Sequence, residues 1–148
     1  TKAMVKLQSH SATHPTSFVQ YACAKAFERY DETLAAVTSM TAEYERRKNW
    51  LIPALNQIDG FKCAMPEGAF YAFVDVRQML GEEFADSAAV ADRLLNESHI
   101  VVTDGEGFGA EGFLRLSYAT SMEQLREGAT RILRLAESVQ PAKASASR

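Results

Sequence analysis

The sequence predicts an α+β domain of two layers, in which helices cover an antiparallel or mixed sheet. Two patterns carry this prediction. Residues 38–58 have the apolar spacing of a long amphipathic helix, whereas residues 113–118 alternate between two faces as a strand does. Short strand-like runs separated by turn residues lie between them, and a last helical pattern follows. The order helix, long helix, strand, strand, helix, strand, strand, helix contains no internal repeat.

The first 30 residues predict a polar loop between two helices. Residues 1–7 resemble the end of a helix already under way, so we expect the sequence to begin inside one. After polar residues 9–13, Pro15 suits the first turn of the next helix, where its missing N–H costs nothing. That helix places three apolar residues on one stripe: Phe18, Ala22 and Ala26. His10 and His14 are four residues apart, but without a third ligand we expect a polar loop and no metal.

Residues 38–58 form the longest helical pattern. Its apolar stripe consists of Met40, Tyr44, Leu51, Leu55 and Ile58. The opposite side carries the charged residues Glu43, Glu45, Arg46, Arg47 and Lys48, which we interpret as a solvated face before a partner surface. Pro53 lies inside the pattern and predicts a kink or the local loss of one hydrogen bond, and Gly60 follows the helix as its stop signal.

Three elements are predicted between residues 61 and 103. A strand begins at residues 61–64 and resumes over residues 69–76 after Pro66-Glu-Gly68. Because residues 69–76 are apolar on both faces, they predict a central strand that is covered on both sides. A helix over residues 87–97, capped by Asp86 or Ser87, precedes a third strand at residues 100–103.

Half of the eight glycines fall between residues 105 and 112. A glycine-rich phosphate cradle joins a strand to a helix and continues into a Lys-Ser or Lys-Thr pair. This segment instead joins two predicted strands and lacks that pair. We therefore interpret these glycines as turn residues.

Residues 113–118 predict a strand that leads directly into the last helix. Leu114, Leu116 and Tyr118 face one way, and Arg115 faces the other, beside Phe113 and Ser117. Thr120-Ser-Met-Glu123 has the pattern of a capping box, so a helix is predicted over residues 122–138. Its apolar face would contain Leu125, Ala129, Ile132, Leu133 and Ala136.

Arg115 is the candidate ligand-binding residue of this strand. A guanidinium offers its donors in a planar fork that fits a carboxylate or a phosphate. The alternative is a solvated arginine or a structural ion pair, because most arginines lie at the surface. The residues alone leave both interpretations open.

Length and composition exclude several classes of protein. At 148 residues the chain is long enough for one core. Its net charge of -3 provides no basic field for nucleic acid or an anionic membrane. Cys23 and Cys63 have no metal-ligand spacing, so we interpret both as reduced thiols that fill a core. The longest apolar run, residues 69–74, is too short to span a bilayer, and no signal-peptide pattern is present, so we expect a soluble, cytoplasmic protein.

The segment Phe113-Leu-Arg-Leu-Ser-Tyr-Ala-Thr-Ser121 resembles the C-terminal signature of one enzyme family. The family is the fold-type I pyridoxal-phosphate aminotransferases of the aspartate aminotransferase group. Residues 8–17, 66–73 and 105–112 are similar to three further stretches of that family, in the same order and spacing. The resemblance covers about residues 1–137.

The resemblance implies a role for each matched segment. The domain would be the α+β small domain of an α/β enzyme, and Arg115 would bind the α-carboxylate of the substrate. Phe70 would line the mouth of the active site, although as sequence it is simply a core residue. The loop with Ser11 and Thr13 would project across a homodimer interface towards the neighbouring subunit's cofactor; His14 stands there where asparagine is common.

The resemblance also implies what this chain does not supply. A transaminase needs a lysine that forms a Schiff base with the cofactor, an acid for the pyridine nitrogen and donors for the phosphate. In the family these groups come from the large domain. The lysines here lack the family's Ser-x-x-Lys context: Lys2, Lys6, Lys25, Lys48, Lys62 and Lys143. We therefore predict no catalytic residue in this chain, and we expect the chain alone to be inactive and to bind no pyridoxal 5'-phosphate.

Two functions remain open at this point. The first is the C-terminal small domain of an aminotransferase that acts on an amino acid, aspartate by default, and a 2-oxo acid. The second is a non-catalytic binding or dimerisation module that retains the fold. We expect residues 1–30 to contact the large domain and a second subunit, residues 31–140 to form the small domain, and residues 141–148 to be a disordered tail.

Overall fold

The computed structural model describes residues 1–139, which belong to two compact units, Thr1–Ala42 and the part of the chain from Glu43 onwards. The expected tail at residues 141–148 lies outside the described residues. Within residues 1–139, no helix combines the length and the apolarity that crossing a membrane requires.

The first unit is helical. It contains α1 (Lys2–Ser11), α2 (Ser17–Glu28) and the first part of α3 (Tyr30–Asn56), and no side chain of α1 or α2 is buried. The expectation that Pro15 occupies the first turn of a helix is wrong, because α2 begins at Ser17 with Thr16 as its N-cap. The expectation that Cys23 fills a core is also wrong, because it is exposed.

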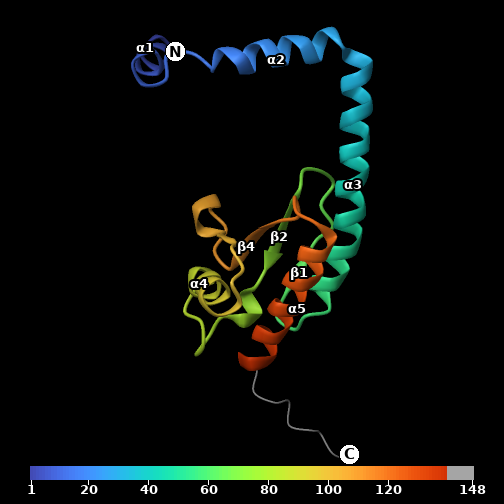
Figure 1. Ribbon diagram of the computed structural model, residues 1–148. Helices are drawn as coiled ribbons and strands as arrows, with labels where there is room; N and C mark the ends of the chain where they lie inside the picture. The colour runs from blue at the N-terminus through green and yellow to red at the C-terminus, as the bar shows by residue number, and fades with distance from the viewer. Residues whose placement is uncertain (140–148) are drawn as a thin grey trace, which may run out of the picture. The chain divides into compact units, whose positions relative to one another are not determined.

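A four-stranded antiparallel sheet organises the second unit. Its strand order is β1-β2-β4-β3, formed by β1 (Lys62–Cys63), β2 (Tyr71–Asp75), β4 (Phe113–Ser117) and β3 (Thr103–Asp104). Every neighbouring pair is antiparallel. The α+β prediction is confirmed, and β2 and β4 form the centre of the sheet (Figure 1).

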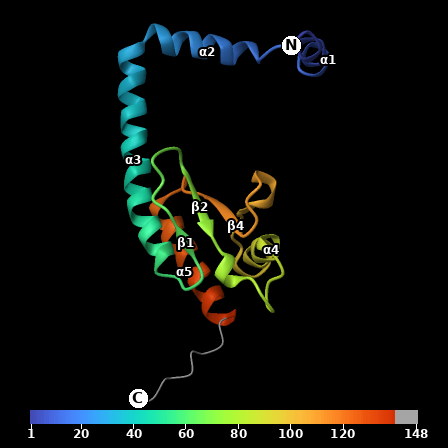
Figure 2. The ribbon, with the colours of Figure 1, turned by 180° about the vertical axis from the view of Figure 1, so that it is seen from behind.

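The hydrophobic core lies on one face of this sheet. Ala72 and Val74 of β2 and Leu114 and Leu116 of β4 are buried there. Side chains from the C-terminal half of α3, from α4 (Ser87–Ser98) and from α5 (Met122–Val139) complete the core: Leu51, Ile52, Leu55, Val90, Leu94, Leu125, Ile132, Leu135 and Ala136. Figure 2 shows the same elements from behind. Burial of each large aliphatic side chain stabilises the fold by about 1.5–3 kcal/mol.

The other face of the sheet is open within residues 43–139. We call it the open face; it carries Tyr71, Phe73, Asp75, Phe113, Arg115 and Ser117. Tyr71 and Phe73 are 37% and 38% exposed. The central position predicted for residues 69–76 is confirmed, but the prediction that both sides are covered is wrong, because the core helices all pack on the Ala72 side.

The helix caps show how closely a local pattern specifies an element. Asp86 caps α4, and its side chain accepts a hydrogen bond of 2.8 Å from the Ala89 N–H. At α5 the predicted capping box is displaced by one residue: the Gln124 N–H donates to Ser121 Oγ over 3.2 Å, and Thr120 instead contacts the Gln124 side chain. On α5, Leu133 is 39% exposed, and Leu135 takes the expected buried position.

The segment before β4 is mostly irregular. The strand predicted at residues 100–103 is reduced to β3, and Val101 is 82% exposed. The glycine-rich segment joins β3 to β4, as predicted, through the 3-10 turn η2 (Glu106–Phe108). A Cβ on Gly105 would lie 2.3 Å from the Ala110 carbonyl oxygen, so this turn requires glycine there. A second 3-10 turn, η1 (Arg77–Met79), follows β2.

Candidate anion-binding site

Arg115 lies in the middle of β4, on the open face of the sheet. Its neighbours Leu114 and Leu116 are buried in the core, and strand alternation therefore directs Arg115 to the opposite side. Its register partners are Phe73 on β2 and Thr103 on β3. The side chain is half-buried.

Two aromatic rings contact the guanidinium. The Arg115 Cζ atom lies 4.7 Å from the centroid of the Tyr71 ring and 4.6 Å from that of Phe108. Such cation–π contacts contribute about 0.5–2 kcal/mol each. Arg115 Nη2 also donates to Thr103 Oγ1 over 3.4 Å, which is a long and therefore weak hydrogen bond. The rings thus make the stronger of the contacts that orient the side chain.

Arg115 differs from the other half-buried arginines in its lack of a carboxylate partner. Arg47 pairs with Glu43, Arg93 with Glu83 and Glu97, and Arg131 with Glu127. Among residues 1–139, no carboxylate lies within ion-pair distance of Arg115. A guanidinium has five N–H donors, so most of its hydrogen-bonding capacity remains free.

The acid on the open face is engaged elsewhere. Asp75 accepts hydrogen bonds of 2.6 and 3.0 Å from Arg77 Nη2 and Nε, and these bonds hold the pKa of the Asp75 carboxyl below its usual range. The Arg77 guanidinium in turn lies over the Phe113 ring, at 5.2 Å from its centroid. The open face therefore presents Arg115 as a cation without an anion.

Phe70 lies one ring away from Arg115. Its ring centroid is 4.5 Å from that of Tyr71 and 5.6 Å from that of Tyr44, so Tyr71 connects Phe70 to the guanidinium. Ala69, immediately before it, has a φ of 60°, and its carbonyl accepts a hydrogen bond of 3.1 Å from the Tyr118 hydroxyl. The structure thus brings Phe70 close to Arg115 without direct ring contact between them.

Ser11 and Thr13 belong to the first unit. Ser11 ends α1, where its hydroxyl donates to the Leu7 carbonyl over 3.1 Å, and Thr13 adopts a left-handed φ of 57° in the loop that follows. Both residues are exposed. Their expected role at a neighbouring subunit stays a prediction.

The described residues do not fit pyridoxal phosphate. A site for it requires a lysine beside donors for the phosphate. Lys62, on β1, lines a cavity of about 720 Å³, but its strand partner is Asp75 and the walls include Tyr71, Phe73 and Phe113. The other described lysines are exposed, except for half-buried Lys48 within the charged stretch of α3. No lysine of residues 1–139 therefore stands in surroundings suited to the cofactor.

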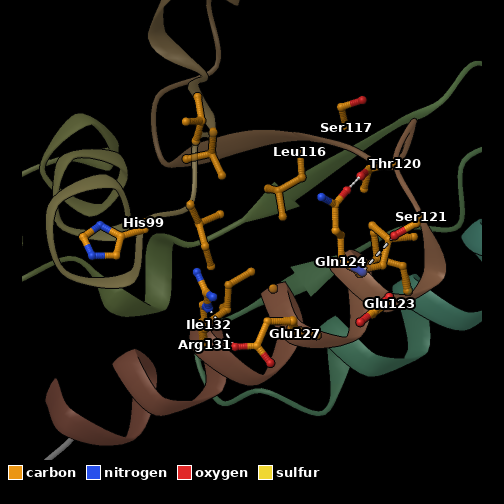
Figure 3. A pocket seen from close by; sticks show the side chains of 17 residues that line it. His99, Leu116, Ser117, Thr120, Ser121, Glu123, Gln124, Glu127, Arg131 and Ile132 are labelled. Atoms are coloured by element: carbon orange, nitrogen blue, oxygen red, sulfur yellow. Dashed lines mark hydrogen bonds and ion pairs between the residues drawn. The ribbon is translucent and has the colours of Figure 1, made fainter.

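A larger cavity, of about 830 Å³, lies between residues 99–102 and the first turns of α5 (Figure 3). Among its 17 lining residues, Arg131 is bound to Glu127 at 2.9 Å and to the Ser98 carbonyl at 3.3 Å. Glu123 adds negative charge to the wall. This cavity therefore suits an anion less well than the surroundings of Arg115 do.

A polar cluster around the buried Ser87 joins α4 to the glycine-rich turn. The Ser87 hydroxyl lies 2.5 Å from Asp104 Oδ1 and 2.9 Å from Glu111 Oε1, and Glu111 Oε1 also accepts from the Ser87 N–H at 2.8 Å. The Gly112 N–H donates to Ser87 Oγ over 3.2 Å. These bonds fix the end of the turn that carries Phe108. We therefore interpret the cluster as structural.

Sequence reasoning missed Tyr71 and Phe108 as neighbours of Arg115. Tyr71 could have been found, because it shares one face with Phe73 on a strand that was predicted to lie centrally, beside the strand of Arg115. Phe108 gave no signal, since it stands in a turn and reaches Arg115 only through the pairing of β3 with β4. The Ser87 cluster also joins positions that are distant in sequence.

Comparison with known proteins identifies the family of the chain. The family model "Aminotransferase class I and II" matches residues 1–132. The chain is 41% identical over 139 residues to an aspartate aminotransferase of Geobacillus stearothermophilus, covering 92% of this chain and 34% of that protein. It thus spans about a third of the length of the curated relatives it matches.

Solved structures share the fold. An aspartate aminotransferase of Thermus thermophilus, solved with maleate, superposes with a TM-score of 0.77 at 36% identity, covering 90% of this chain and 34% of the other. An aromatic aminotransferase of Pyrococcus horikoshii gives a TM-score of 0.77 at 36% identity, covering 93% and 36%. The chain belongs to the aminotransferase class I and II family.

Proposed function

We propose that this chain is the C-terminal small-domain part of a pyridoxal-phosphate-dependent aminotransferase and that Arg115 binds the α-carboxylate of the substrate. The observation that carries the proposal is a half-buried guanidinium that has two ring contacts and, among the described residues, no carboxylate partner. The enzyme transfers an amino group between an amino acid and a 2-oxo acid. Its membership of the family supports this reaction.

The chemistry of the substrates explains why one arginine serves both half-reactions. Amino donors and oxo acceptors differ in their side chains but share an α-carboxylate. A planar guanidinium binds that group through two parallel hydrogen bonds, which fix the orientation as well as the position of the substrate. The part of Arg115 is therefore binding and orientation.

The cofactor would be held by the portion of the enzyme that this chain does not span. The chain covers about a third of its relatives, and the lysines among residues 1–139 do not fit the cofactor. Pyridoxal phosphate supplies an electron sink for carbanion chemistry. Aspartate is the default donor, because several relatives are named aspartate aminotransferases, although others are named for aromatic amino acids.

The remaining assignments concern partners and compartment. The protein would form a homodimer in which the loop of Ser11 and Thr13 lies at the neighbouring subunit. The many apolar side chains that residues 1–42 expose support this arrangement; Phe18, for example, is 74% exposed. The compartment would be the cytoplasm. Cys23 and Cys63 are both free thiols, which is the usual state of cysteines in a reducing compartment.

The test uses the full-length protein that contains this sequence. With pyridoxal phosphate, aspartate and 2-oxoglutarate, we expect steady formation of oxaloacetate, together with competitive inhibition by maleate. The 148-residue chain alone, treated with the cofactor and desalted, should retain no yellow absorbance. A full-length protein that exchanges no amino group between any amino acid and 2-oxo acid would favour the non-catalytic binding or dimerisation module instead.

A further inference from the structure

We propose that Tyr71 and Phe108 are positioning residues for Arg115, which hold its guanidinium so that the N–H donors remain directed at an incoming carboxylate. This inference rests on the proposed function of Arg115. The two rings approach the Cζ atom to 4.7 and 4.6 Å, whereas the hydrogen bond to Thr103 is 3.4 Å long. Both ring distances lie well within the range of a cation–π contact, whereas 3.4 Å is near the outer limit for a hydrogen bond. The rings therefore restrain the guanidinium more strongly than Thr103 does.

The kind of contact matters for binding. A carboxylate partner would orient an arginine but would occupy the donors that a substrate needs. An aromatic ring attracts the face of the guanidinium and leaves the N–H groups in its plane free. The two rings thus restrict the flexible side chain and keep it available for a ligand.

The rings are themselves held in place. Tyr71 packs against Phe70 with centroids 4.5 Å apart, and Phe108 meets Phe73 edge to face at 6.4 Å. Phe73 stacks on Phe113 at 5.1 Å, so the aromatic contacts continue across the open face. The Phe108 N–H donates to the Gly105 carbonyl over 2.9 Å in the turn that requires glycine. The glycine-rich turn therefore positions Phe108 against Arg115.

Core packing explains these rings less well. Tyr71 is 37% exposed and Phe108 is 52% exposed, so each buries only part of its surface within this unit. Their replacement should therefore reduce ligand binding more than stability. Trp50 provides a matched comparison, because Arg126 lies 5.8 Å from its ring centroid in a cation–π contact of similar kind, and the Trp50 ring packs against the core.

The experiment uses the full-length protein and measures three quantities for each variant: the Kd of maleate, the KM and kcat for both substrates, and the melting temperature. Phe108→Leu and Tyr71→Leu should each raise the Kd of maleate and both KM values by about 3- to 10-fold, with kcat changed less. Phe108→Tyr and Tyr71→Phe retain the rings and should stay within about twofold of the wild type. Trp50→Leu should lower the melting temperature and leave the Kd of maleate unchanged.

The outcomes separate this inference from the function on which it rests. Wild-type maleate affinity in both leucine variants, alongside weakened affinity in Arg115→Lys, would overturn the positioning role and leave the proposed function intact. Unchanged affinity in Arg115→Lys itself would overturn the proposed function. If the leucine variants lost maleate affinity only in proportion to a fall in melting temperature, the loss would follow from an unstable fold. The rings would then serve packing, which would contradict the inference.

Discussion

The two thiols of the chain have different environments, and their reactivity tests the local structure. Cys63 is buried, and its burial raises the pKa of the thiol, while Cys23 is exposed. A raised pKa means less thiolate at a given pH, and the thiolate is the reactive form. In the 148-residue chain at pH 8, we expect Cys23 to react with a chromogenic disulfide at least about 10-fold faster than Cys63.

The matched variants are Cys23→Ser, which should abolish the fast phase, and Cys63→Ser, which should retain it. Addition of urea above the unfolding midpoint should make the two thiols equivalent. Equal rates in the folded wild-type chain would show that the Cys63 thiol is accessible to the reagent, which would contradict its burial in β1.

Glu43 makes an acid-sensitive contribution to stability. Hydrogen bonds from Arg46 and Arg47 lower the pKa of its carboxyl to about 2. Because the folded pKa is depressed, the contribution is fully present above the unfolded pKa and is lost as the pH falls towards about 2. Glu43→Gln should therefore be slightly less stable than the wild type at pH 7 and equal to it near pH 2.

Urea unfolding of the two proteins between pH 7 and pH 2 provides the measurement, with Glu45→Gln as the control on the same helix. The difference should be small at pH 7, since Glu43 and its two arginine partners all remain partly exposed to solvent. If the difference in stability between the wild type and Glu43→Gln grew as the pH fell, the pH dependence would be opposite to the expected one. Glu43 would then not be the source of an acid-sensitive contribution to stability.

At the level of elements, Ser87 connects α4 to the turn between β3 and β4. It is fully buried, and its hydroxyl contacts Asp104, Glu111 and the Gly112 N–H. Ser87→Ala leaves these groups without that partner, so we expect the free energy of unfolding to fall by about 1–3 kcal/mol. Chemical denaturation of the variant measures the loss.

Ser138→Ala is the control for this variant, because it removes a serine hydroxyl near the end of α5 that bonds the Leu135 carbonyl at 2.7 Å in an exposed position. Its effect should stay within about 0.5 kcal/mol. If the two serine variants lost equal stability, the Ser87 cluster would have no special structural importance.

The sequence predicted the elements better than their surroundings. The Asp86 cap, the strand at Arg115 and the long α3 helix follow from local patterns, and all are present. Coverage of β2 could not be read from its residues, because an apolar face looks the same whether helices cover it or it stays open. The contact of Phe108 with Arg115 was hidden for a related reason, since only the pairing of β3 with β4 creates it.

At the scale of the whole molecule, sequence reasoning reached the family through short motifs, and the comparisons confirm that family. Composition alone would have given only a globular protein of one core. Arg115 itself could be named from its strand, but its interpretation as a binding residue depended on the resemblance. Its freedom from carboxylate partners among residues 1–139 became visible only when β2, β3 and β4 were assembled.

Substitution of Arg115 tests the central claim most directly. In the full-length enzyme, Arg115→Lys keeps the charge but loses the planar fork, and we expect kcat/KM to fall by about 30- to 1000-fold, which is about 2–4 kcal/mol of transition-state binding. Steady-state kinetics should show this loss alike for the amino acid and the 2-oxo acid, whereas an amine without a carboxylate should react at nearly the same rate in both proteins. Full activity of Arg115→Lys on amino acids would make Arg115 a structural residue and contradict the account.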